Sequence, residues 1–238
     1  MSGAPIRAAL FDAVGTLLVL REPVGETYAR LAAAFDARVP AGRLDEAFAR
    51  CRARAGPVGY APGLPLERVV ALERAWWRRL VDDTFRSADG AALPRPFEAC
   101  FERLFEHYGS AAAWDLAPGA RGCLEALRAR GFATAIASNF DLRLPAVLRG
   151  LGLDALLDAV VLPGEVGAPK PARALFDAAL ARLGVAAEEA VFVGDAPAED
   201  LAGARAAGLR TVDVRTLATL GELPELLARG EPAALETR

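Results

Sequence analysis

The stretch IRAALFDAVGT, residues 6–16, decides how the rest of the sequence is interpreted. Its first six residues are mostly apolar, and a short run of this kind is typical of a buried strand. Asp12 ends the run, and Gly15 follows at a position typical of a turn. We therefore predict a strand over residues 6–11 with a carboxylate at its carboxyl end.

C-terminal to residue 119, apolar runs of strand length alternate with helical patterns. This alternation indicates βαβ units and a mainly parallel sheet. Gly131 and Gly184 mark two of the helix ends. The predicted strands are 132–137, 159–162, 190–193 and 210–214, and the predicted helices are 119–130, 142–148, 171–183, 198–207 and 220–228.

Residues 18–111 show a different pattern, with helical periodicity and no convincing strand. The helical patterns cover 25–37, 41–54, 64–83 and 96–108, and a Gly/Pro-rich stretch over 56–65 separates the second from the third. We therefore predict an α/β fold in two parts. Residues 1–17 and 112–238 form a doubly wound, mainly parallel sheet core, and residues 18–111 form an inserted all-helical cap.

The composition narrows the classes of function. Of 238 residues 53% are hydrophobic, and the net charge is −3 without a basic run, so we expect no nucleic-acid partner. No apolar stretch reaches the ~18 residues of a membrane helix, and we see no signal peptide before the first strand. Three cysteines without metal-ligand spacing fit a reducing environment, so we expect a cytoplasmic protein. Nothing in the sequence indicates the oligomeric state.

Polar residues follow the predicted strands where each strand ends. Asp12 follows the first strand, Ser138 and Asn139 follow the strand at 132–137, and Asp195 follows the strand at 190–193. Lys170 lies in the loop after the strand at 159–162, and it is the one lysine among 28 lysines and arginines. A lone lysine in such a chain is a candidate for a site where a planar guanidinium does not fit. Because the carboxyl ends of parallel strands meet at one edge of a sheet, we expect these side chains to converge.

These residue types suit phosphoryl transfer. An aspartate carboxylate can act as a nucleophile, and two carboxylates on neighbouring strand ends can hold Mg²⁺. A hydroxyl and an ammonium can bind the remaining phosphoryl oxygens. With a single histidine, His107, the chain has little to offer a mechanism built on a Ser-His or Cys-His pair.

The order of these residues resembles the haloacid dehalogenase-like hydrolases, over essentially the whole chain. That family has a strand ending in D-x-x-G-T, a second strand ending in Ser or Thr, a Lys before a helix, and a Gly-Asp pair followed by another acid. The corresponding residues here are Asp12-Ala13-Val14-Gly15-Thr16, Ser138-Asn139, Pro169-Lys170-Pro171, and Gly194-Asp195 with Glu199-Asp200.

The resemblance implies a role for each matching residue at the reacting centre. Asp12 would be the nucleophile, and Lys170 would neutralise charge between Asp12 and the phosphate. Asp12, Asp195 and the backbone carbonyl of Val14 would bind Mg²⁺. Asp200 would lie in the metal shell or directly behind it, where such groups orient the ligands.

Ser138 and Asn139 would bind the substrate, which the resemblance predicts to be a small phosphorylated metabolite. Val14 departs from the family's phosphatases, which usually carry at that position an aspartate that protonates the leaving alcohol. A positioned acid is worth roughly 10²–10⁴-fold in rate, so we expect slow hydrolysis of alkyl phosphates and better hydrolysis of acyl or aryl phosphates. Glu22 or a water could take over part of the acid's role.

Two other interpretations stay open. A 2-haloacid dehalogenase expels halide, which needs no proton, but such enzymes need no metal and normally lack the Gly-Asp pair that stands here at Gly194-Asp195. A weakly catalytic binding or regulatory protein could retain the metal site without the acid. The first alternative predicts turnover in chelator, and the second predicts ligand stabilisation without turnover.

Overall fold

The computed structural model describes residues 4–61 and 63–229, and it separates into two compact units. The first, the sheet unit, comprises Met1–Val19, Gly59–Gly63 and Asp115–Arg238. The second, the helical unit, comprises Leu20–Val58 and Leu64–Trp114. The chain passes between them after Val19 and after Trp114, where the sequence placed the boundaries after residues 17 and 111. The structure also groups Gly59–Gly63, part of the Gly/Pro-rich stretch, with the sheet unit.

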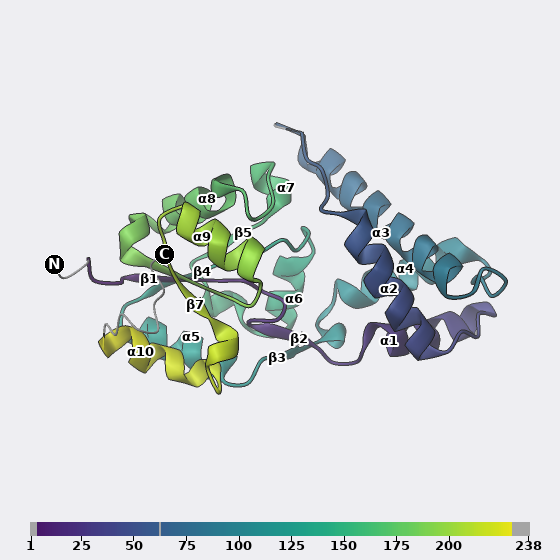
Figure 1. Ribbon diagram of the computed structural model, residues 1–238, viewed down its shortest axis with the longest axis horizontal. Coiled ribbons are helices and arrows are strands. Elements are labelled where there is room, and N and C mark those ends of the chain that lie inside the picture. The colour runs from purple at the N-terminus through teal and green to yellow at the C-terminus, as the bar shows by residue number, and fades with distance from the viewer. Residues whose placement is uncertain (1–3, 62, 230–238) are drawn as a thin grey trace. The chain divides into compact units, whose positions relative to one another are not determined.

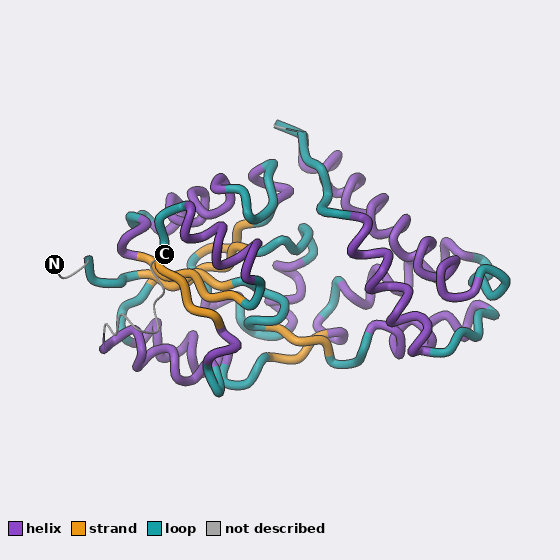
Figure 2. The backbone as a smooth tube through the Cα atoms, in the orientation of Figure 1, coloured by secondary structure: helices purple, strands orange, loops and turns teal. Residues whose placement is uncertain are grey.

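The described residues of the sheet unit form a five-stranded sheet in the order β5-β4-β1-β6-β7 (Figure 2). Every neighbouring pair is parallel, so the predicted doubly wound sheet is confirmed. β1 lies in the middle, with Phe11 opposite both Ile136 of β4 and Val193 of β6. The strands are β1 Ala8–Phe11, β4 Ala133–Ala137, β5 Ala159–Val161, β6 Ala190–Gly194 and β7 Arg210–Asp213.

Helices cover both faces of this sheet. In Figure 1, α8 and α9 lie on one side of it and α5 and α10 on the other. The strands can be continuous apolar runs because they are covered on both sides, and all five residues of β6 are buried. The helices are α5 Ala120–Ala129, α6 Leu144–Gly150, α7 Pro163–Val166, α8 Arg173–Leu183, α9 Gly203–Ala206 and α10 Leu223–Arg229.

One core cluster fixes α8 onto the sheet. Phe176 of α8 meets Phe192 of β6 edge to face, with ring centroids 5.2 Å apart. Leu10 of β1 and Leu175 of α8 are buried in the same cluster. This packing holds α8, and therefore the loop that precedes it, against the carboxyl ends of the strands.

The structure differs from the sequence prediction in several elements of this region, among them the short helix α7, which was not predicted. The helix predicted over 198–207 begins as a π-helix, Pro197–Ala202, before it continues as α9. Two short strands, β2 Leu18–Leu20 and β3 Trp114–Leu116, pair with each other as a separate two-stranded sheet and were not predicted. Three residues are too few for an alternating pattern to stand out from its surroundings.

The described residues of the helical unit fold into four long helices, as predicted. A proline directly precedes each of them, at Pro23, Pro40, Pro65 and Pro96. Proline's fixed φ fits this position, where its own N–H would have no partner inside the helix. The helices are α1 Val24–Ala32, α2 Ala41–Ala55, α3 Leu66–Asp89 and α4 Phe97–Tyr108. α3 continues past residue 83, where the prediction ended it.

A second core cluster holds these helices together. Tyr28 of α1 stacks on Phe85 of α3, with ring centroids 5.7 Å apart, and Phe101 and Leu104 of α4 are buried in the same cluster. None of the helices in the described part of the chain is long and apolar enough to cross a membrane. The three cysteines are free and buried, two of them in this unit.

We expect Phe85→Ala to destabilise the helical unit by about 3–5 kcal/mol, because the side chain is fully buried and leaves a cavity. Urea unfolding followed by tryptophan fluorescence tests this, since Trp76, Trp77 and Trp114 all belong to the helical unit. Leu66→Ala is the control, because Leu66 is 62% exposed and its loss should change stability by no more than about 0.5 kcal/mol. Equal unfolding midpoints for the two variants would contradict the assignment of this core.

Candidate active site

The sequence-predicted residues converge at the carboxyl ends of the strands in the sheet unit. Asp12 directly follows β1, and its N–H donates to the carbonyl of Val193 at 2.9 Å. Ser138 directly follows β4, and Asp195 directly follows β6. Asp12 and Ser138 are almost fully buried. The parallel topology therefore brings together residues that lie far apart in the sequence.

Lys170 joins two of the carboxylates. Its ammonium donates to Asp12 Oδ1 at 2.6 Å and to Asp200 Oδ1. The side chain of Lys170 is 2% exposed, and its Nζ lies 5.3 Å from the ring centroid of Phe192. A buried lysine next to an aromatic face and between two carboxylates is held as a cation in one place.

Asp12, Asp195 and Asp200 form an acidic cluster that fits a divalent cation. Each offers an oxygen, and these oxygens lie within 4.8 Å of one another. The Lys170 ammonium donates hydrogen bonds to two of these three carboxylates, so the carboxylates outnumber this ammonium. Carboxylate oxygens at this spacing are the ligands that a hard cation such as Mg²⁺ takes. The donor set and the excess negative charge both fit a metal at this position.

Asp200 connects the cluster to the loop after β6. Its Oδ2 accepts hydrogen bonds from the backbone N–H of Asp195 at 3.2 Å and of Ala196 at 3.1 Å. Its Oδ1 accepts from Lys170, and the residue is 1% exposed. Asp200 therefore orients both the loop that carries Asp195 and the ammonium of Lys170.

Two glycines leave room for these carboxylates. Gly15 has φ +91°, and a Cβ at this residue would lie 2.4 Å from Asp195 Oδ2. A Cβ at Gly194 would lie 2.4 Å from Asp200 Oδ2 and 2.7 Å from Asp200 Cβ. Only glycine fits at these two positions while the carboxylates stay where they are.

Ser138 and Asn139 point to different partners although they are adjacent. Ser138 acts to lower the pKa of Asp12, and its hydroxyl accepts a hydrogen bond from the Phe140 N–H at 3.3 Å. The carboxamide of Asn139 instead faces the main chain of Lys170. Its Oδ1 accepts from the Lys170 N–H at 2.7 Å, and its Nδ2 donates to the Lys170 carbonyl at 3.1 Å and to Glu199 Oε2 at 3.2 Å. Sequence reasoning gave no partner for Asn139 and no contact for Glu199.

Burial and charge perturb the ionisation of the cluster. Burial raises the pKa of Asp12, the nearby carboxylate of Asp200 raises it further, and Lys170 opposes both effects. Burial and Asp200 also raise the pKa of Asp195. Burial alone would lower the pKa of Lys170, but Asp12 and Asp200 together hold it above its ordinary value. Lys170 therefore stays charged, and the carboxylates gain from any further positive charge.

Val14 occupies the position of the missing acid, and Glu22 was considered as its substitute. Val14 has an apolar side chain and is 37% exposed. Glu22 lies in the helical unit, where it accepts hydrogen bonds from Arg30 at 2.7 Å and Thr27 at 3.1 Å. These hydrogen bonds lower the pKa of Glu22.

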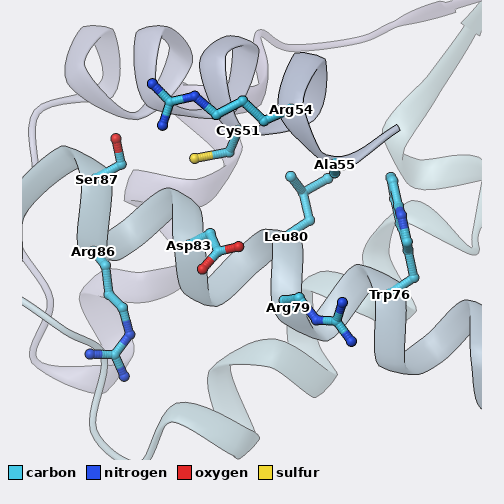
Figure 3. A pocket seen from close by; sticks show the side chains of 9 residues that line it. All are labelled: Cys51, Arg54, Ala55, Trp76, Arg79, Leu80, Asp83, Arg86 and Ser87. Carbon is cyan, nitrogen blue, oxygen red and sulfur yellow. The ribbon is translucent and has the colours of Figure 1, made fainter. Parts of the chain in front are cut away.

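A separate pocket of about 520 Å³ lies within the helical unit between α2 and α3 (Figure 3). Cys51 and Arg54 line it from α2, and Trp76, Asp83 and Arg86 line it from α3. Its lining holds three arginines and one aspartate, whereas the cluster in the sheet unit holds three aspartates.

The sequence pattern of haloacid dehalogenase-like hydrolases matches residues 6–208. The chain belongs to this family. It is 36% identical to haloacid dehalogenase-like hydrolase domain-containing protein 3 of Mus musculus over 206 residues, which cover 87% of this chain and 80% of that protein. It is also 36% identical to a phosphoserine phosphatase of Thermus thermophilus over 187 residues, covering 69% of this chain and 74% of the phosphatase.

Solved structures show the same fold. A protein described as a dehalogenase superposes with a TM-score of 0.67 at 26% identity, covering 94% of this chain and 97% of that one. A haloacid dehalogenase-like phosphatase from Thermococcus onnurineus superposes with a TM-score of 0.61 at 24% identity, covering 93% and 98%. The resemblance drawn from the sequence is confirmed, and the protein is a hydrolase of this family.

We expect Gly194→Ala to displace the Asp200 carboxylate, because the new Cβ would overlap both Oδ2 and Cβ of Asp200. The variant should lose about 1–3 kcal/mol of stability and bind Mg²⁺ about 10–100-fold more weakly. Thermal unfolding and calorimetric Mg²⁺ titration measure the two effects. Gly122→Ala is the control, since a Cβ on that helical residue meets nothing within 4 Å. Unchanged Mg²⁺ affinity in Gly194→Ala would show that Asp200 does not support the metal site.

Proposed function

We propose that this protein is a Mg²⁺-dependent phosphatase that hydrolyses a small phosphorylated metabolite through an aspartyl-phosphate on Asp12. The observation that carries the proposal is the acidic cluster of Asp12, Asp195 and Asp200 around a buried lysine. A carboxylate that attacks a phosphate dianion needs positive charge between the two anions. The three carboxylates of this cluster attract cations and would therefore supply that charge.

The cluster favours a phosphatase over a dehalogenase. Expulsion of halide by a carboxylate needs no metal, and buried carboxylates that repel one another would then only raise the cost of folding. Two relatives support this choice by their names, the phosphoserine phosphatase above and a ribulose-1,5-bisphosphate 5-phosphatase of Halopiger xanaduensis. The latter is 42% identical over 122 residues, half the length of each protein.

Asp12, Asp195 and the backbone carbonyl of Val14 would hold the Mg²⁺, with Asp200 in the shell or directly behind it. The bound ion would supply positive charge to the transferring phosphoryl group. Asp200 already receives two backbone N–H groups and the Lys170 ammonium, so it is fixed in place to orient the other ligands.

The chain's own residues perform the covalent steps. An oxygen of Asp12 attacks phosphorus, the bond from phosphorus to the leaving oxygen breaks, and the leaving group departs with that electron pair. Lys170 and the Ser138 hydroxyl bind the phosphoryl oxygens as charge develops on them. Water then attacks phosphorus, and the bond to Asp12 breaks to release phosphate and restore the carboxylate.

Val14 limits the leaving groups that this site serves. An alkoxide needs a proton as it leaves, and the side chain at this position has none to give. A carboxylate or a phenolate leaves as a stable anion, so acyl and aryl phosphates require less help. We therefore infer that the natural substrate is a phosphorylated metabolite whose leaving group is stable without protonation, or that water delivers the proton slowly.

The first test is hydrolysis of an aryl phosphate by the purified protein with Mg²⁺ and with chelator. We expect turnover only with Mg²⁺, and we expect its loss in Asp12→Asn, whose amide is no nucleophile. Turnover of 2-chloropropionate in chelator would instead show a dehalogenase. A folded protein that gains stability from Mg²⁺ and phosphate but turns over neither substrate would show a binding protein.

Val14→Asp should restore the missing proton donor. We expect a gain on an alkyl phosphate that approaches about 10²-fold or more, and a much smaller gain on an aryl phosphate, whose leaving group needs little protonation. Steady-state kinetics on both substrates measure the difference. Val14→Asn is the control, because it is polar and of similar size to aspartate but has no carboxyl proton. Equal gains on the two substrates, or a gain in Val14→Asn, would contradict the role assigned to position 14.

A further inference from the structure

The sequence contains one asparagine, no glutamine and one lysine. Asn139 is therefore the one carboxamide side chain of the chain, and it hydrogen-bonds to the main chain of the one lysine, Lys170. A chain that uses arginine in place of lysine nearly everywhere and carries no other carboxamide keeps these two residues in contact. Chemistry specific to both side chains is the simplest reason.

The contact between them is two-sided. The Lys170 N–H donates to Asn139 Oδ1 at 2.7 Å, and Asn139 Nδ2 donates to the Lys170 carbonyl at 3.1 Å. A carboxamide carries an acceptor and a donor on one planar group, which a carboxylate or a hydroxyl cannot present in the same way. The Asn139 carboxamide therefore hydrogen-bonds with both the N–H and the carbonyl of Lys170 at the same time.

The loop that carries Lys170 has few other ways to be held. Lys170 stands between Pro169 and Pro171, which have no N–H, so its own N–H is the one backbone donor of this tripeptide. That donor goes to Asn139. The loop is thereby tied to the end of β4, next to the strand that positions Asp12.

The hydrogen bonds of Asn139 leave little of it for a substrate. Its two Nδ2 hydrogens have two acceptors, the Lys170 carbonyl and Glu199 Oε2 at 3.2 Å. The substrate-binding role predicted from the sequence would require at least one of these bonds to break.

We propose that Asn139 is a positioning residue, whose carboxamide holds the Lys170 main chain so that the lysine ammonium stays between Asp12 and Asp200. This inference rests on the proposed phosphatase function for its effect on rate, but not for the contact itself.

The composition makes the contact directly observable by NMR. Labelling with [¹⁵N]lysine gives one backbone amide signal, that of Lys170, and labelling with [¹⁵N]asparagine gives one side-chain NH₂ group, that of Asn139. In the wild-type protein we expect both to exchange slowly with solvent. A carboxamide that exchanges at the rate of an exposed asparagine would overturn the proposal without any variant being made.

Asn139→Ala should release the Lys170 amide. We expect its signal to shift and its hydrogen exchange to accelerate about fivefold or more, the effect of losing one hydrogen bond. Glu199→Ala is the matched control, because it removes one bond of the carboxamide and keeps both bonds to Lys170. An unshifted Lys170 amide with unchanged exchange in a folded Asn139→Ala protein would contradict the proposal.

Kinetics separate positioning from substrate contact. With an aryl phosphate and Mg²⁺, we expect Asn139→Ala to lower kcat by about 10–10²-fold with little change in KM, because a displaced ammonium serves the transition state poorly. A raised KM with unchanged kcat would instead show that Asn139 binds substrate. If the wild-type protein hydrolyses no phosphate ester, the proposed function fails while the NMR results still decide whether Asn139 holds Lys170.

Discussion

The buried contact of the Lys170 ammonium with Asp12 and Asp200 is the interaction on which the rest of the sheet unit depends. Removing a lysine and two aspartates from water costs several kcal/mol per ion, and attraction offsets this cost only when the geometry is well defined. Here the pKa of Lys170 lies above its ordinary value although burial opposes it, so the two carboxylates decide the outcome. Burial raises the pKa of Asp12 in spite of the lysine, and the nearby carboxylate of Asp200 raises it further.

The need to hold three carboxylates and one ammonium in a defined geometry explains several features of the sheet unit. Gly15 and Gly194 are needed because any side chain there would meet the carboxylates of Asp195 and Asp200 at 2.4 Å. Asp200 accepts two backbone N–H groups because a carboxylate beside two others needs donors. The central place of β1 follows too, since it sets Asp12 between the strand that leads to Ser138 and the strand that leads to Asp195.

Much of this arrangement could be predicted from the sequence because it follows from topology. Strands with buried apolar runs are easy to find, and once they are parallel their ends must share an edge, which places Asp12, Ser138 and Asp195 together. The partner of Asn139 could not be predicted, since a hydrogen bond between a strand end and a loop 31 positions away leaves no periodic signal. The π-helix at Pro197–Ala202 was missed for a similar reason. Its residues have the propensities of an ordinary α-helix. The wider turn, which brings Asp200 to the backbone of Asp195, depends on tertiary contacts that the local sequence does not reveal.

The same charge balance links catalysis to stability. A cluster that holds more carboxylates than cations gains free energy from a bound cation, so such binding stabilises the folded state in proportion to the logarithm of cation concentration. A bound phosphate adds negative charge and so cancels part of the stabilisation that the cation gives to the folded state. It binds favourably only when the metal and Lys170 are both in place. The affinity of the site for anions is therefore conditional on its cations. In the proposed mechanism Val14 would contribute neither charge nor a proton to the departing group, so the leaving anion would have to be stable by its own chemistry. The selectivity of this hydrolase is thus expected to begin with the stability of the leaving anion and only then with its shape.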